Sequence, residues 1–120
     1  MRTLFAVAVV AAALVASSAA QERQVYKIGN GVKSPVLVKE VKPQYTDGAK
    51  ARGVRGIVEM SVIVQADGTV GDNVQITKSL DPDLDEQAIV AVRQWRFKPG
   101  TKDGQAVDVE VQIEMSFTLK

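Results

Sequence analysis

The sequence predicts an α+β domain of two layers. An antiparallel sheet of three strands, or four if an edge strand is added, is covered by one long and one short helix. First, Val107–Leu119 alternates strictly between apolar odd and polar even positions, which is typical of a strand with one buried face. Second, two more alternating segments, Ile57–Val64 and Val70–Thr77, flank Asp67-Gly68, a strong hairpin signal. Third, Pro82–Phe97 carries a single apolar stripe at helical spacing.

Residues 1–20 resemble a signal peptide. Arg2 supplies a basic start, Leu4–Ala16 is apolar, and Ser18-Ala19-Ala20 places small residues at the cleavage positions. Because a bilayer core needs roughly 20 apolar residues, the run is short for an anchor and we expect export with cleavage after Ala20. An uncleaved anchor is the alternative, since the Ala- and Ser-rich tail lengthens the run.

The remaining chain suits one domain with a modest core. Without Arg2, 14 basic residues balance 14 acidic ones, so no global charge favours nucleic acid or anionic lipid. The chain has no His and no Cys, which removes the commonest general base, the thiol nucleophile and most zinc ligands. We therefore expect a protein that is not an enzyme and that holds no cofactor or metal.

The region before the hairpin is predicted from its turn signals. Residues 21–35 form an arm or linker with a turn at Gly29-Asn30-Gly31, and both a short strand and an ordered arm are compatible with it. The domain itself is expected over 36–120. Its first segment, Val36–Val41, lies between two prolines and reads as extended chain that adds a strand to a sheet edge.

The short helix is predicted at Asp47–Arg52. Thr46 is a suitable N-cap, and Gly53 suits the left-handed residue that ends a helix. A helix of this length must lean on the sheet to be stable.

The long helix is predicted to begin after Asp81 as N-cap, with a proline at its first position. The acidic residues there also resemble the start of a calcium loop, but Glu86 and Val92 stand where that loop requires Gly and Glu. Trp95 closes the apolar stripe, so we expect it in the core, with a ligand-stacking platform as the alternative.

Several motifs follow one another at the spacing of the TonB C-terminal domain, which the chain resembles over Val36–Leu119. They are Pro43-Gln44-Tyr45, Ala49, Gly56, Asp67-Gly68-Thr69-Val70, Leu84-Asp85, Ala88 and Trp95-Arg96-Phe97-Lys98-Pro99. The resemblance implies a periplasmic domain of the Gram-negative energy-transducing system. In that family the domain captures the TonB box of outer-membrane receptors by strand addition to its last strand.

Carried onto this chain, the resemblance implies two groups of partner-binding residues. The last strand would pair with the peptide through Val109, Glu110, Val111, Gln112, Ile113 and Glu114, and a second contact would come from Lys42, Pro43, Gln44 and Tyr45. The same edge could instead pair two copies of the chain, which would make it a self-associating structural subunit and a homodimer.

The chain departs from the family at three points. Thr46 stands where the family usually has proline, and Lys42 where some members have glutamine. The four prolines are scattered rather than gathered in a spacer. The twenty or so residues between the N-terminal apolar segment and the domain span at most ~70 Å when extended. We therefore expect receptor binding without a relay of force by this chain alone.

Overall fold

The computed structural model describes residues 24–119, so the predicted signal peptide lies outside the described residues. No helix in this range is long and apolar enough to cross a bilayer. The elements in chain order are β1 Val25–Lys27, β2 Val32–Lys33, β3 Val36–Lys39, α1 Asp47–Ala51, β4 Gly56–Val64, β5 Gln75–Lys78, α2 Pro82–Val92, β6 Arg96–Lys98, β7 Gly100–Lys102 and β8 Gln105–Phe117.

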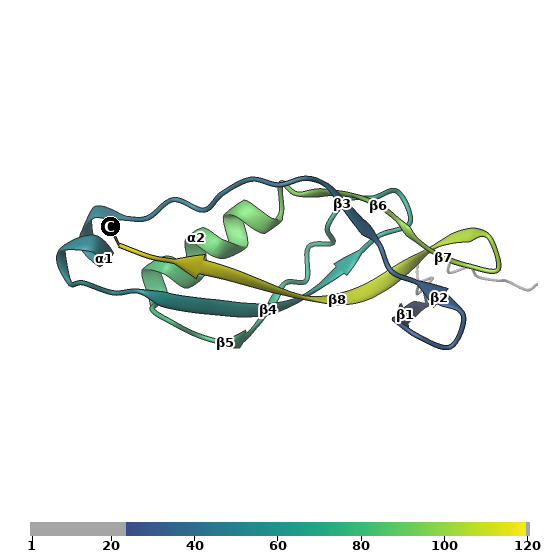
Figure 1. The fold of residues 1–120 in the computed structure, drawn as a ribbon, viewed down its shortest axis with the longest axis horizontal. Helices are drawn as coiled ribbons and strands as arrows, with labels where there is room; N and C mark the ends of the chain where they lie inside the picture. The colour runs from purple at the N-terminus through teal and green to yellow at the C-terminus, as the bar shows by residue number, and fades with distance from the viewer. Residues whose placement is uncertain (1–23, 120) are drawn as a thin grey trace, which may run out of the picture.

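The predicted α+β architecture is confirmed. β8 and β4 pair antiparallel along nine residues, and β5 pairs antiparallel with the other edge of β4 (Figure 1). β7 and β2 extend the sheet beyond β8 in the order β2-β7-β8-β4-β5, and β1 also pairs with β8. The long strand predicted at the C-terminus is therefore the central element of the sheet.

One face of the sheet is apolar because the register matches the two alternations. Val58 lies opposite Met115, Met60 opposite Ile113, and Val62 opposite Val111. The buried residues of α2 join this face in one core, together with Ala49 of α1. The buried residues of α2 are Leu84, Ala88, Ala91 and Val92.

The short helix forms as predicted. The Thr46 hydroxyl accepts a hydrogen bond from the Ala49 amide, and Gly53 adopts a φ of +70° just after the helix. A left-handed residue at this position ends a helix with no Cβ penalty when it is glycine.

The long helix was predicted too long. It ends at Val92, and after a turn and Trp95 the chain forms β6 from Arg96 onward. β6 pairs with β3, and the Phe97 amide donates to the carbonyl of Gly68 at 2.8 Å. These strand contacts outweigh the helical spacing of the last five residues, as tertiary context often does.

The second hairpin strand was predicted to begin too early. Val70 makes only an isolated bridge to Val64, and the Gly71 amide then donates to the carbonyl of Ile63. The chain leaves the sheet there and returns as β5 at Gln75. Glycine, Asp and Asn have low strand propensity, which accounts for the interruption at Gly71-Asp72-Asn73.

The N-terminal region adds strands in three places. β1 pairs with β8 in parallel, β2 pairs antiparallel with β7, and β3 pairs with β6 in a separate two-stranded sheet. The expected turn lies between β1 and β2, where Gly29 bridges to Val32. The extended segment near Val36 therefore does not lie on an edge of the main sheet.

Candidate functional site

The two edges of β8 differ in their partners. The inner edge pairs with β4 from Val109 to Phe117 without a break. On the outer edge, away from β4, β7 pairs with Gln105–Val107 and β1 pairs with Asp108–Glu110. Because Val109 and Glu110 pair with β4 and with β1, the two partner strands must lie on opposite edges.

Beyond Glu110 the outer edge is open. Among the described residues no strand pairs with that side of residues 111–117, which we call the open edge. An open edge presents N–H and C=O groups to any extended segment that can reach it. Four of the six last-strand residues that the sequence predicted lie there, namely Val111, Gln112, Ile113 and Glu114, whereas Val109 and Glu110 are already paired on both sides.

A groove of about 420 Å³ runs beside this edge. Its β8 wall includes outward-facing Glu114 and Ser116 as well as inward-facing Met115 and Phe117. Since side chains of both sheet faces reach it, the groove follows the edge of the strand rather than one face. The opposite wall consists of Glu40, Lys42, Pro43, Tyr45 and Trp95.

All of these residues except Trp95 belong to one extended segment, 40–46, which runs from β3 back to α1 along one side of the molecule (Figure 1). Trp95 fixes one point of it, because its indole Nε1 donates to the carbonyl of Val41 at 2.8 Å. Tyr45 fixes another. Its ring meets the Phe117 ring edge to face, with centroids 5.5 Å apart, and its hydroxyl donates to the carbonyl of Val54.

Trp95 is buried, as expected for a core residue, with 7% of its surface exposed. It belongs to the core cluster that Val111 and Ile113 also join. Its ring nevertheless forms part of the groove wall. The core and the groove therefore share this side chain.

Of the six predicted last-strand residues only Glu114 lines the groove, where it faces part of the predicted Lys42–Tyr45 group. Lys42, Pro43 and Tyr45 line it, but Gln44 is exposed and does not. Sequence reasoning did not include the residues from Met115 to Thr118. The sequence does indicate that these residues belong to the strand, because the alternation continues to its end. It does not show at which residue the outer edge of the strand becomes free.

Two salt bridges, which we call the ionic clasp, link the C-terminal end of α1 to the N-terminal end of α2. They thereby help to position α1 and the end of the 40–46 segment that leads into it. Arg52 donates to the Asp81 carboxylate at 2.7 Å and to Asp83 at 3.2 Å. The hydrogen bond from Arg52 lowers the pKa of Asp81 below its usual range, and it raises the pKa of the guanidinium in turn. Asp81 also caps α2, accepting from the Asp83 amide at 3.0 Å.

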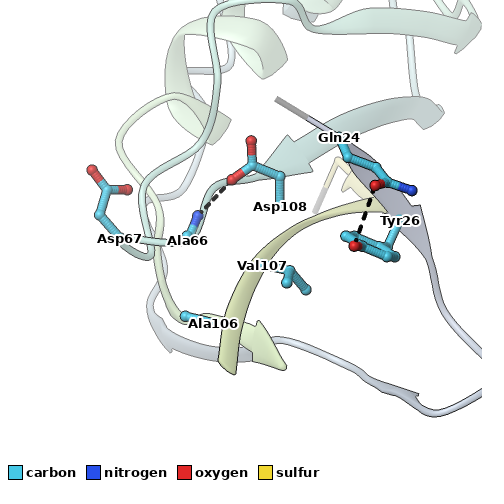
Figure 2. A pocket seen from close by; sticks show the side chains of 7 residues that line it. All are labelled: Gln24, Tyr26, Ala66, Asp67, Ala106, Val107 and Asp108. Atoms are coloured by element: carbon cyan, nitrogen blue, oxygen red, sulfur yellow. Dashed lines mark hydrogen bonds between the residues drawn. The ribbon is translucent and has the colours of Figure 1, made fainter. Parts of the chain in front are cut away.

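A second hollow, of about 470 Å³, lies at the other end of β8 (Figure 2). Gln24 and Tyr26 border it on the β1 side, and the Asp108 carboxylate accepts from the Ala66 amide at 2.9 Å. Asp67, the other acid there, accepts from the Thr69 amide. These carboxylates hold a turn, and no cluster of metal-ligating side chains occurs within residues 24–119.

The chain is similar to several known proteins. The family model described as Gram-negative bacterial TonB protein C-terminal matches residues 41–119. Protein TonB of Vibrio cholerae is 32% identical over 90 residues, 74% of this chain and 37% of the relative. Protein TonB of Xanthomonas campestris pv. campestris is 38% identical over 78 residues, 64% of this chain and 34% of the relative. The chain thus spans about a third of the length of these relatives.

The solution NMR structure of the Pseudomonas aeruginosa TonB CTD has the same fold. It superposes with a TM-score of 0.60 at 24% identity, covering 78% of this chain and 93% of that one. The matched motifs, the fold and the family model lead to one conclusion: the chain belongs to the TonB C-terminal family.

Proposed function

We propose that this domain captures an extended segment of an outer-membrane receptor, its TonB box, in energy-coupled transport across the envelope. The observation that carries the proposal is the open edge at residues 111–117, next to Val109 and Glu110, which are paired on both sides. Family membership supports the transport setting, and with it a periplasmic location and a binding role rather than catalysis.

The groove suits a peptide in extended conformation. A segment that pairs with the open edge would place its side chains alternately toward the two faces of the sheet. On one side it would meet the buried Met115 and Phe117, and on the other the exposed Glu114 and Ser116. Lys42 and Glu40 add one charge of each sign to the opposite wall. Affinity would come mainly from the backbone, and selectivity from these side chains.

Titration of the isotope-labelled protein with a TonB-box peptide tests the proposal. The peptide should be taken from a receptor encoded in the same genome, and amide shifts should be followed by NMR. We expect the shifts to concentrate at residues 111–117 and 42–45. The matched control is the same peptide with a central proline, which lacks a donor and should bind much more weakly.

Two results would contradict the proposal. Shifts confined to β3 or to the exposed face of α2 would place the contact elsewhere. Equal binding of the proline peptide would exclude backbone pairing. Self-association is the competing use of the same edge, and it would appear as concentration-dependent shifts at residues 111–117 without any peptide.

A further inference from the structure

β1 occupies the same edge of β8 that the proposed ligand would use. Val25, Tyr26 and Lys27 pair in parallel with Asp108, Val109 and Glu110, on the side of β8 that faces away from β4. β1 ends opposite Glu110, and the open edge begins at the next residue. The chain therefore already carries one extended segment bound to this edge, and that segment stops where the open edge starts.

The pairing of β1 is weak compared with that of β4. β1 is three residues long, whereas β4 pairs with β8 over nine. Parallel pairing is also slightly less stable per residue than antiparallel pairing. Val25 and Lys27 are exposed, and only Tyr26 is partly buried.

Side chains add little to hold β1 in place. The ring of Tyr26 lies 5.4 Å from the Lys102 ammonium, and its hydroxyl reaches the Gln24 side chain at a long 3.4 Å (Figure 2). None of the three residues belongs to the core cluster. Segments with few buried contacts open at low free-energy cost, so β1 can leave β8 without unfolding the domain.

We infer that β1 is an internal competitor for the binding edge, a strand that a long incoming segment must displace. This inference rests on the proposed function. A peptide confined to residues 111–117 can add to β8 beside an undisturbed β1. A peptide that continues past Glu110 meets β1 in its path and gains those additional backbone pairs only after β1 is released. β1 thereby limits how much of β8 the domain offers to a partner.

The test uses the full chain with two prolines in β1, Val25→Pro and Lys27→Pro, which remove backbone donors and weaken the strand. The matched control is Val25→Ala with Lys27→Ala, which keeps the donors and shortens the side chains. Circular dichroism confirms that both variants fold. The probes are two TonB-box peptides from one receptor, of about seven and about twelve residues, which correspond to the open edge alone and to a longer pairing.

The long peptide should bind the proline variant about tenfold more tightly than the wild type, because the fraction of chains with a free edge rises. The short peptide should bind all three proteins equally. Equal affinity of the long peptide for the wild type and the proline variant would overturn the inference and leave the proposed function standing.

If neither peptide binds any of the three proteins, the proposed function fails and a third probe decides the inference. This probe is a synthetic copy of Gln24–Ile28, the segment that contains β1. Amide shifts at residues 107–111 in the proline variant, and much smaller ones in the alanine control, would support β1 as a displaceable strand. No shift in the proline variant would overturn it.

Discussion

The two halves of β8 share one sequence pattern but not one environment. From Gln105 to Glu110 the strand has β7, β1 or β4 beside it, and Val109 and Glu110 are paired on both edges. From Val111 to Phe117, β4 is its only partner strand among residues 24–119. The alternation of side chains decides which face is buried, whereas the presence of neighbours decides which backbone groups remain available.

The largest expected effect concerns Trp95, in the wall of the groove beside the open half. Trp95 packs in the core and holds the groove wall through Val41, so Trp95→Ala should cost about 3–5 kcal/mol of unfolding free energy. Denaturant titration measures it. Trp95→Phe, the control, keeps most of the packing and loses only the indole donor. A loss under about 1 kcal/mol for the alanine variant would show that the ring is not a core anchor.

Gln112→Pro should weaken binding of a TonB-box peptide at least tenfold, because proline removes a donor and bends the strand. Gln112 lies in the middle of the open half and also pairs with Ser61 of β4, so folding must first be checked by circular dichroism. Gln112→Ala keeps the backbone donor and should bind nearly as the wild type does. A folded proline variant with unchanged affinity would move the contact to Lys42–Tyr45.

The ionic clasp on α1 should give a pH-dependent contribution to stability. Because Arg52 lowers the pKa of Asp81 in the folded state, the contribution is complete above the unfolded pKa of about 3.9 and is lost as the pH falls through the lowered value. Asp81→Asn keeps a good N-cap and removes the charge. Its stability deficit should therefore shrink in acid. A deficit that is as large in acid as at neutral pH would show that the charge is not its cause.

The smallest effects are expected from replacing two acidic side chains, one in each half of β8. Glu114 lines the groove and lies opposite Glu59 on the outer face, so Glu114→Ala should change peptide affinity little and stability by less than about 0.5 kcal/mol, toward greater stability. Glu110 accepts a hydrogen bond from Ser61 in the covered half. Glu110→Ala should leave affinity for a short peptide unchanged. A large loss for Glu110→Ala alone would reverse the roles given to the two halves.

Much of this fold could be predicted because local patterns agree with the tertiary structure. The caps at Thr46 and Asp81, the turn at Asp67-Gly68 and the two long strands are each encoded within a few residues. Elements that depend on distant partners were predicted less well. The Trp95–Phe97 segment has helical spacing, but pairing with β3 and Gly68 makes it extended.

The candidate site shows the same limit. The residues of the last strand and of Lys42–Tyr45 could be named from the family resemblance, and the structure places Lys42, Pro43, Tyr45 and Glu114 around one groove. The sequence did not show that β1 covers the first part of the outer edge. Its short alternation over Val25–Lys27 is compatible with a free arm as well as with a parallel strand, and only the pairing with Asp108–Glu110 distinguishes them.

The turns at Asp67-Gly68 and Asp103-Gly104 differ in the space around them, and therefore in how well they would accept an inserted segment. Gly68 has a φ of +88°, and a Cβ there would collide with the carbonyl oxygen of Phe97, because β6 rests directly on the turn. Gly104 has a φ of +80° with no atom within 4 Å of such a Cβ. A tag or a reporter loop belongs at Asp103-Gly104. The same insertion at Asp67-Gly68, an equally ordinary hairpin signal, would detach β6 and the tryptophan beside it.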